Sequence, residues 1–450
     1  MKLPKSNNWF YIALVAIFML SVALRLWRID APLADWHSWR QSDTAAVARN
    51  FIKFGLDPLR PRFDDLSNIP SGMDNPMGWR MVEFPLYQVV AASLFRLLPV
   101  FSIEVWLRLI TIVISSATGL ILGLMFGIPA ALVYAILPYS IFYGRTILPD
   151  PFMVFWSVLA VYLLTRNKLW LSAVCASIAL LVKPFAIFLL LPIPYLLFKR
   201  FSLIRLFAYS LISLLPLFLW RKWISQFPEG IASYTWLFNS NNIRFKGSWF
   251  HWLFAKRIGE LMLGFWGLIP FGLGIAKDRD WTARLWLVGA LSYLVIIATG
   301  NVQHDYYQIL LLPVLAVYTA KGFVYLYRQS YLLSLISFIF MIAFSWFTIR
   351  TYYWINHPEI IEAGREADRI LPKDAKVIAS YNGDTTFLYQ TNRQGWPIGF
   401  EIDKKITLGA THYVTISPSD SDGETKDLAS RYTVLVRNDR YAIIDLTALK

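Results

Sequence analysis

The sequence predicts a polytopic α-helical membrane protein with a small α/β domain at its C-terminal end. Of its 450 residues, 56% are hydrophobic and only 16% are charged, and the mean hydropathy is +0.47. Hydrophobic runs of roughly 15–22 residues alternate with connectors rich in lysine and arginine, which is typical of membrane-spanning helices. From Arg350 onward the composition becomes that of a soluble protein.

The net charge of +14 is also explained by membrane-spanning helices, whose flanks carry basic residues. In a soluble protein such a charge suggests a nucleic-acid partner, but here most basic residues flank hydrophobic runs. Orientation by the positive-inside rule accounts for them, so we expect no nucleic-acid partner. Cys175 is the single cysteine, which excludes an intramolecular disulfide.

The first hydrophobic run covers residues 9–27 and follows Lys2 and Lys5. We interpret it as a retained first helix rather than a signal peptide, because many further hydrophobic runs follow. The basic residues before it predict a cytoplasmic N-terminus. Residues 28–104 then form a first outer loop.

This outer loop contains two predicted interfacial helices, at residues 35–54 and 84–100, separated by a polar stretch at 56–80. In the first helix, apolar side chains recur at helical spacing on one side: Trp36, Trp39, Val47, Phe51 and Phe54. Asp43 falls on that same side. A carboxylate on an apolar stripe needs a partner or a role, because its unpaired burial is costly.

About ten further spans are predicted after the outer loop, which gives about eleven in all and a transmembrane domain at residues 1–349. They cover residues 105–126, 130–143, 152–164, 171–182, 185–198, 206–220, 258–276, 285–299, 309–320 and 331–347. Wherever this topology brings the chain back to the inner side, the loop is rich in lysine and arginine, as the positive-inside rule requires.

Residues 350–450 are predicted to form a soluble α/β domain on the outer face. Helical periodicity covers residues 359–371, and strand patterns cover 376–380, 412–416, 432–436 and 441–445. The last two strands are expected to pair as a hairpin across residues 438–440. Alternating helices and strands favour an α/β arrangement.

The predicted topology gathers polar and ionisable residues at the outer membrane boundary, which indicates a functional site. These residues are Asp43, Arg145, Asp150, Lys183, His304, Asp305, Tyr306 and Tyr307. Structural alternatives stay open for several of them. For Asp43 the alternative is an ion pair with Arg40 or Arg49, and for Asp150 it is the capping of a helix. For the others, the alternatives are that Lys183 extends its ammonium to the membrane surface, that Arg145 anchors the chain at the interface, and that His304 is a structural loop residue.

The sequence contains no histidines, cysteines or carboxylates at a spacing typical of metal ligands, and no phosphate-binding loop. One or two carboxylates can bind a divalent ion without a readable motif, so metal dependence stays open. An enzyme on the outer face has no nucleotide-sugar pool, and its activated donor must therefore arrive in the membrane. A sugar on a polyprenyl phosphate fits this constraint. Asp43 would take the acceptor hydroxyl's proton in an inverting single displacement, and nearby cations would stabilise the leaving phosphate.

Five segments of the chain read HSWRQSDTAAVARNF, EFPLYQ, WLRLITIVIS, YGRTILPDPF and QHDYYQILLLP. In their order they resemble the polyprenyl-phosphate-dependent GT-C glycosyltransferases, in particular the bacterial protein O-mannosyltransferase and aminoarabinose transferase group (glycosyltransferase family 39 and relatives). The resemblance implies that Asp43 matches the catalytic aspartate and Asp150 the second acidic position. Arg108 matches an arginine at the head of the following span.

The chain also departs from that group. Where aminoarabinose transferases have an acidic–lysine–proline sequence, it keeps the acid as Glu83 but reads Phe84 in place of the lysine. Arg40, Arg145 or Lys183 would have to contact the phosphate instead. Thr44 replaces the glutamate of the Asp-Glu pair that protein mannosyltransferases carry. The acceptor (glycan, lipid or protein) and the sugar therefore stay open.

The resemblance implies an integral protein of the bacterial inner membrane whose C-terminal domain is periplasmic. Two other functions are compatible with a chain of this composition. One is a transporter or flippase of lipid-linked sugars, which predicts ionisable residues near the middle of the bilayer and related halves. The other is a membrane scaffold that displays residues 350–450.

Overall fold

Contacts within the chain divide this computed structural model into two compact units. It describes residues 8–419 and 423–450, so Lys2 and Lys5, on which the cytoplasmic N-terminus was predicted, lie outside the described residues. Unit 1 comprises Met1–Ile29, Arg108–Trp223 and Tyr234–Tyr352, and unit 2 comprises Asp30–Leu107, Ile224–Ser233 and Tyr353–Lys450. Each unit is described by itself.

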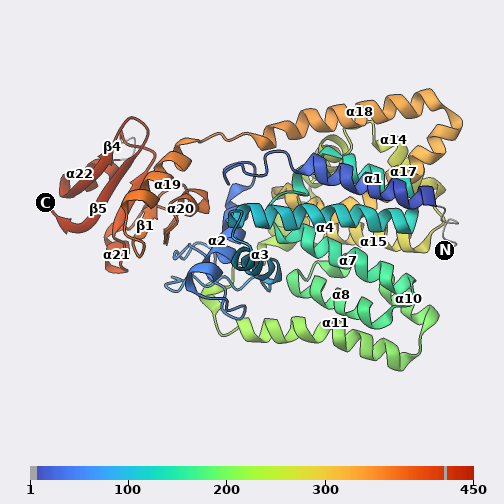
Figure 1. Ribbon diagram of the computed structural model, residues 1–450, viewed down its shortest axis with the longest axis horizontal. Helices are drawn as coiled ribbons and strands as arrows, with labels where there is room; N and C mark the ends of the chain where they lie inside the picture. The colour runs from blue at the N-terminus through green and yellow to red at the C-terminus, as the bar shows by residue number, and fades with distance from the viewer. Residues whose placement is uncertain (1–7, 420–422) are drawn as a thin grey trace. The chain divides into compact units, whose positions relative to one another are not determined.

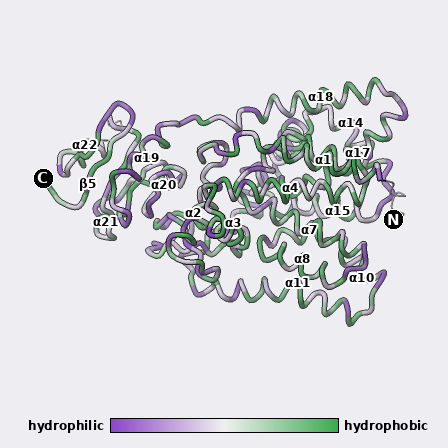
Figure 2. The backbone as a smooth tube through the Cα atoms, viewed as in Figure 1, coloured by the Kyte–Doolittle hydropathy of each residue, from purple (hydrophilic) through white to green (hydrophobic). Residues whose placement is uncertain are grey.

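Unit 1 is a bundle of apolar helices. Its helices are α1 (Asn8–Arg25), α4 (Ile103–Phe126, from Arg108), α5 (Ile128–Ile136), α6 (Pro138–Tyr143), α7 (Pro149–Thr165), α8 (Leu169–Val182), α9 (Ala186–Leu189), α10 (Pro192–Arg200), α11 (Leu203–Ile224), α12 (Trp236–Asn239), α13 (Gly247–Phe250), α14 (Leu268–Lys277), α15 (Trp281–Ile296), α16 (Ala298–Gln303), α17 (Leu312–Gln329) and α18 (Tyr331–Ile349). The long ones run lengthwise beside one another (Figure 1). Hydrophobic residues dominate them (Figure 2), and helices satisfy their own backbone hydrogen bonds, as a lipid environment requires.

The protein is an integral membrane protein. Among the described residues, five helices are long and apolar enough to cross a membrane: Asn8–Arg25, Ile103–Phe126, Leu203–Ile224, Asp305–Gln329 and Tyr331–Tyr353. Five shorter apolar helices accompany them, and one of these, α3 (Leu86–Leu97), belongs to unit 2. The predicted spans at 105–126, 206–220 and 331–347 lie within or close to the bounds of α4, α11 and α18. The total of about eleven spans stays a prediction.

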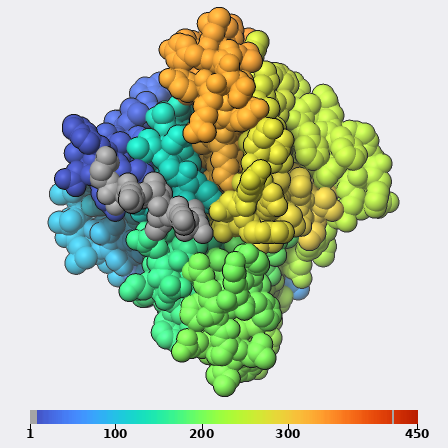
Figure 3. Space-filling view, turned by 90° about the vertical axis from the view of Figure 1, so that its right-hand side faces the viewer, coloured from blue at the N-terminus to red at the C-terminus, as the bar shows by residue number. Residues whose placement is uncertain are grey.

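Glycines allow the closest helix contact in unit 1, between α14 and α17. A Cβ atom on Gly274 would lie 1.9 Å from the carbonyl oxygen of Tyr318, and one on Gly322 would lie 1.6 Å from that of Pro270. Two helix backbones therefore touch without intervening side chains, as small residues permit in membrane proteins. In the end-on view of Figure 3, segments from α1 (blue) to α18 (orange) meet on one face.

Unit 2 combines outer-loop helices with the α/β domain. Its helices are α2 (Ser38–Phe54), α3, α19 (Glu359–Ile370), α20 (Thr385–Gln390), α21 (Ile402–Thr407) and α22 (Glu424–Arg431), and its strands are β1 (Lys376–Ala379), β2 (Gln394–Trp396), β3 (His412–Thr415), β4 (Tyr432–Arg437) and β5 (Ala442–Leu449). The sheet order is β2-β1-β3-β5-β4. β2, β1 and β3 are parallel, whereas β5 is antiparallel to both β3 and β4. The predicted C-terminal hairpin is thus confirmed.

Alternating side chains of the strands form a core on each face of this sheet. Val377 and Val414 pack in one core with residues of α19 and α20. Ile378 and Tyr413 pack in the other core with residues of α21 and α22. This alternation follows from the two-residue period of a strand, and it makes a three-layer α/β/α arrangement.

The first outer loop extends the sheet at its β2 edge. The amide of Leu66 donates to the carbonyl of Gly395 at 2.7 Å, and the amide of Gly395 donates to the carbonyl of Asp64 at 2.8 Å. The Leu66 side chain enters the same core as Ile378 and Trp396. The outer loop and residues 353–450 therefore share one hydrophobic core, a connection that the sequence did not predict.

Candidate functional site

Helix α2, which carries Asp43, is buried on every side along its middle. It follows His37, which has a left-handed backbone (φ 54°), and ends before Gly55 (φ 99°). Residues 40–48 are all buried. The sequence predicted a single apolar stripe on this helix, but α3 and α20 both pack against it and cover further sides. Burial of its polar residues follows, and each of them needs a partner.

The carboxylate of Asp43 is 5% exposed and is contacted by two donors. The guanidinium of Arg80 lies 2.9 Å from Oδ2. The hydroxyl of Thr385 donates to Oδ1 at 2.7 Å. Each carboxylate oxygen has two lone pairs, so an Asp43 with one donor on each oxygen can still accept a further hydrogen bond.

The predicted alternative partners of Asp43 bind other carboxylates. Arg40 forms an ion pair with Glu83 at 2.7 Å. Arg49 forms one with Asp64 at 2.5 Å. The alternative that Asp43 only pairs with Arg40 or Arg49 on its own helix is therefore wrong, because the polar stretch of the outer loop brings Arg80 to it instead.

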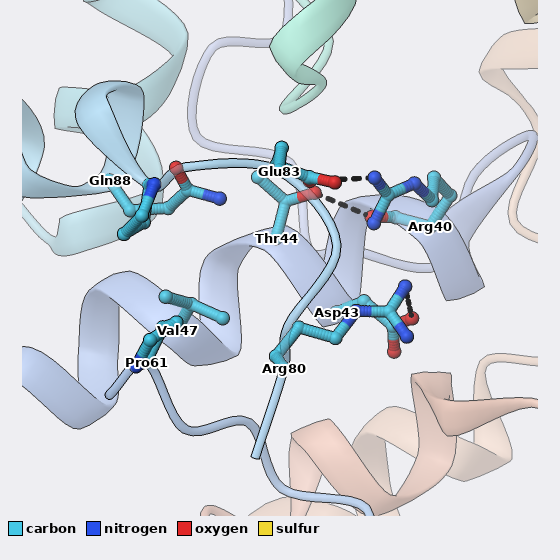
Figure 4. A pocket seen from close by; sticks show the side chains of 9 residues that line it. Arg40, Asp43, Thr44, Val47, Pro61, Arg80, Glu83 and Gln88 are labelled. Atoms are coloured by element: carbon cyan, nitrogen blue, oxygen red, sulfur yellow. Dashed lines mark hydrogen bonds and ion pairs between the residues drawn. The ribbon is translucent and has the colours of Figure 1, made fainter. Parts of the chain in front are cut away.

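The Asp43–Arg80 and Arg40–Glu83 ion pairs line a pocket with about 210 Å³ of empty space, a volume that includes open solvent (Figure 4). Its lining residues are Arg40, Asp43, Thr44, Val47, Pro61, Arg80, Glu83, Pro85 and Gln88. The Nε atom of Arg80 is buried and has no hydrogen-bond partner among the described residues. Because a buried donor without an acceptor is costly, this atom favours an anionic or oxygen-bearing ligand.

A second buried carboxyl group lies near Asp43. Burial raises the pKa of Asp65 from 3.8 to about 7, against the opposing effect of the hydrogen bonds from Ser67, and the charge of Asp43 raises it further. The Asp65 Oδ1 atom accepts the amide of Ser67 at 2.8 Å. Asp65 thus titrates near neutral pH and keeps its proton in mildly acidic solution.

In unit 1, Asp150 and Lys183 form a buried ion pair. Lys183 Nζ lies 2.8 Å from both carboxylate oxygens of Asp150. The same ammonium lies 5.8 Å from the ring centre of Tyr306 and 5.5 Å from that of Tyr307. Asp150 stands in the first turn of α7, but the capping position is Leu148. The alternative that Asp150 caps this helix is therefore wrong.

Asp305 is fully buried and heavily hydrogen-bonded. The hydroxyl of Tyr143 donates to its Oδ1 at 2.6 Å, and the hydroxyl of Tyr352 donates to its Oδ2. Arg257 lies 3.5 Å from Oδ2. The neighbouring His304 ring lies 5.8 Å from that of Trp236. The sequence thus placed Asp305 correctly in a polar–aromatic cluster, but its phenol partners come from distant segments.

Arg108 and Arg145 both hold the end of the first span. Arg108 donates to the carbonyl of Ile29 at 2.7 Å, and Arg145 donates to that of Arg28 at 3.3 Å. Both guanidinium groups are nearly inaccessible. These contacts order the chain where it leaves the first helix.

The predicted site residues are thus divided between the units. Asp43, Arg40 and Glu83 meet in unit 2, and the others lie in unit 1. Sequence reasoning missed Arg80 and Thr385. Arg80 precedes Glu83 by three residues and could have been found as the nearest cation to the missing lysine. No local pattern marks Thr385. In the described part of the chain, no group of three or more potential metal ligands occurs.

The structure is similar to solved membrane glycosyltransferases. ArnT from Cupriavidus metallidurans, solved bound to undecaprenyl phosphate, aligns over 98% of both chains with 12% identity and a TM-score of 0.64. The Archaeoglobus fulgidus oligosaccharyltransferase, solved with zinc and sulfate, aligns over 94% of this chain and 71% of its own, with 10% identity and a TM-score of 0.56. Arabinofuranosyltransferase AftD from Mycobacteria aligns over 98% of this chain and 42% of its own, with 14% identity and a TM-score of 0.55.

The chain has a GT-C fold. No protein-family model matches the sequence, and no curated protein matches it. The predicted resemblance to GT-C glycosyltransferases is confirmed at the level of the fold. Identities of 10–14% establish the fold alone, so the reaction has to be argued from the residues of this chain.

Proposed function

We propose that the protein is a membrane glycosyltransferase that moves a sugar from a polyprenyl-phosphate donor to an acceptor hydroxyl, with Asp43 as the general base. The observation that carries this proposal is the buried Asp43 carboxylate in a pocket that also contains two arginines. The GT-C fold supports it, because the similar ArnT structure contains undecaprenyl phosphate. We also propose a bacterial inner-membrane location with a periplasmic unit 2.

The partners of Asp43 suit a general base. The guanidinium of Arg80 lies 2.9 Å from it and holds one carboxylate oxygen in place. The hydroxyl of Thr385 donates to the other oxygen and takes up no proton. A carboxylate within hydrogen-bond distance of an acceptor hydroxyl can remove its proton as the new bond forms.

The two arginines suit the leaving group. The sequence lacks the lysine of the aminoarabinose transferases, and Arg80 and Arg40 line the same pocket as Asp43. A guanidinium has five N–H donors, and in Arg80 one donor group faces Asp43 while the buried Nε has no partner among the described residues. Arg80 is therefore our candidate for the phosphate contact, with Arg40 beside it.

The proposed step balances without a covalent enzyme intermediate. The acceptor oxygen attacks the anomeric carbon while its proton passes to Asp43. The bond from the anomeric carbon to the phosphate oxygen breaks, and its electron pair leaves with the polyprenyl phosphate. Nearby guanidinium groups stabilise the developing charge. A single displacement inverts the anomeric centre.

Within unit 1, Asp150 is proposed as the second acidic residue of the transferase, and Lys183, His304, Asp305, Tyr306 and Tyr307 are proposed as substrate-binding residues. The support is chemical: an ion pair, two aromatic rings and a buried carboxylate occur together in that unit. Arg108 and Arg145 are proposed to support this region by ordering the end of the first span.

An Asp43→Asn variant tests the proposal. The purified full-length protein is incubated with a panel of polyprenyl-phosphate sugars and membrane-extract acceptors, and released polyprenyl phosphate is measured. We expect the wild-type protein to consume at least one donor and Asp43→Asn to lose about 10²–10⁴-fold in kcat, the range that a positioned base contributes. The amide keeps the size of the carboxylate but cannot take the proton.

Asp64→Asn is the matched control. Asp64 is as buried as Asp43 and is paired with Arg49 of α2, the helix that carries Asp43, but it does not line the pocket. We expect this variant to lose stability rather than transfer activity per folded molecule. Normal turnover by Asp43→Asn, or an equal loss in both variants at equal thermal stability, would contradict the assignment.

A further inference from the structure

Helix α20, far along the chain from the outer loop, contributes a hydroxyl group to Asp43. The Thr385 Oγ1 atom lies 2.7 Å from Asp43 Oδ1 and 3.2 Å from the carbonyl oxygen of Trp39. A hydroxyl has one proton to donate. The contact to the Asp43 carboxylate is the shorter of the two, so Asp43 is its acceptor.

Two donors from different segments fix the plane of the Asp43 carboxylate. Thr385 holds Oδ1 from α20, and Arg80 holds Oδ2 from the outer loop. With Arg80 alone the carboxylate could rotate about its terminal torsion, which has a broad energy profile. The hydroxyl therefore restricts the directions in which the lone pairs of Asp43 point.

The hydroxyl of Thr385 is not what docks α20 on α2. The Thr386 hydroxyl donates to Ser38 Oγ at 2.9 Å. Arg49 donates to the carbonyl of Tyr389 at 3.0 Å, and its guanidinium lies 3.8 Å from the centre of the Tyr389 ring. None of these contacts involves Asp43. The packing of the two helices thus has its own support.

We infer that Thr385 is a positioning residue for Asp43, so that the C-terminal α/β domain completes the proposed catalytic pocket. This inference rests on the proposed transferase function. Thr385 does not line the pocket itself. It acts through Asp43, by holding the carboxylate in the orientation from which a second lone pair meets the acceptor hydroxyl.

Three variants of the full-length protein test this inference. Thr385→Val removes the hydroxyl at nearly constant volume, and Thr385→Ser restores it. Thr386→Val is the matched control, because it removes a hydroxyl of the same helix whose hydrogen bond also reaches α2 but goes to Ser38. Thermal unfolding in detergent establishes that each variant is folded.

The first measurement does not depend on sugar transfer. A water-soluble carbodiimide with an isotopically labelled amine modifies accessible carboxyl groups, and mass spectrometry gives the modification rate of Asp43. We expect about tenfold faster modification in Thr385→Val, because a hydrogen bond to a charged group that shields Oδ1 is lost. Thr385→Ser and Thr386→Val are expected to match the wild-type protein.

The second measurement is transfer from a polyprenyl-phosphate sugar. Thr385→Val is expected to lower kcat about 10–100-fold with an unchanged KM for the donor, because a misplaced base costs rate rather than binding. Thr385→Ser is expected to recover most of the rate, and Thr386→Val to keep it.

Two results would overturn the inference: an unchanged modification rate of Asp43 in Thr385→Val, or an equal loss of kcat in Thr386→Val at equal stability. A wild-type protein that transfers sugar from no polyprenyl-phosphate donor would instead refute the proposed function. In that case the modification rates still decide whether Thr385 controls Asp43.

Discussion

Individual charged residues in unit 2 are sorted into specific pairs. Three carboxylates, Asp43, Asp64 and Glu83, each bind a different arginine: Arg80, Arg49 and Arg40 respectively. Removing one partner from a buried pair leaves an uncompensated charge and costs far more than the pair contributes. The pairs therefore specify the path of the outer loop over α2 as much as they stabilise it.

Asp65 is one residue whose titration makes the stability of unit 2 depend on pH. Its pKa is raised to about 7, mainly by burial. Between pH 4 and 7, roughly, the folded protein keeps a proton on Asp65 that the unfolded chain has lost, so the free energy of unfolding falls as the pH rises through this range. Asp65→Asn cannot ionise, and its side-chain oxygen can still accept the Ser67 amide.

We therefore expect Asp65→Asn to flatten the dependence of the melting temperature on pH between 5 and 8. At pH 8 the variant gains on the order of 4 kcal/mol at most over the wild-type protein, at pH 5 it gains roughly 1.5 kcal/mol, and below about pH 4 the two are alike. Thermal unfolding followed by tryptophan fluorescence measures this. Asp57→Asn, which changes a half-exposed carboxylate of the same loop, is the control. An unchanged slope in Asp65→Asn would contradict the assignment.

The sequence identified part of the candidate site for a clear physical reason. Asp43 stood out because a carboxylate at helical spacing among aromatic residues is costly without a partner. Its partners could not be predicted, because Arg80 lies 37 residues and Thr385 lies 342 residues from Asp43 in sequence. Spacing along one helix predicts neighbours on that helix, whereas both partners depend on how a loop and a separate sheet pack.

At the scale of elements, the span predicted at 331–347 lies within α18, and the sheet edge was not predicted. The spans predicted at 130–143 and 185–198 are each broken into two helices, α5 and α6 or α9 and α10, because Pro138 and Pro192 begin new helices. Helix α19 and strands β1, β3, β4 and β5 lie within a few residues of the predicted ranges. Strand β2 covers only Gln394–Trp396, which is too short for an alternating pattern to show. Its pairing with the outer loop leaves no local signature at all, because Leu66 enters a core built from residues 300 and more positions away.

Gly395 lies at this edge of the sheet and leaves no room for a larger side chain. A Cβ atom there would lie 1.8 Å from the backbone oxygen of Val377, and no side-chain rotation can relieve that clash. Gly395→Ala is expected to cost about 3 kcal/mol, or roughly 6–12 °C in the melting temperature of unit 2. Gly247→Ala is the control, because a Cβ atom there meets nothing within 4 Å. A stable Gly395→Ala protein would mean that β2 does not pair as described.

At the scale of the molecule, unit 2 is a composite of segments that are remote in sequence. The predicted boundary at residue 350 is close to the division at Tyr353, but residues 30–107 belong to the same compact unit as residues 353–450. The Leu66 side chain lies in one core of the sheet, and Ala34 packs against the other. Shared cores of this kind make segments unfold together, so the helix that bears Asp43 should depend on the sheet for its order.

A mild change in the sheet core tests this dependence in the intact protein. Ile378 is fully buried beside Leu66, and Ile378→Val deletes one methylene at a cost of about 1 kcal/mol. If unit 2 opens cooperatively, the backbone amides of α2 lose the same 1 kcal/mol of protection as those of β1 and β3, which is roughly a fivefold rise in the rate of hydrogen exchange. The amides of α17, in unit 1, serve as the internal control and keep their rates. Hydrogen exchange resolved by mass spectrometry measures all three regions in one experiment. Unchanged exchange in α2 alongside faster exchange in β1 and β3 would show that the outer-loop helix is held independently of the sheet, and would remove the structural basis for a catalytic carboxylate positioned from the C-terminal domain.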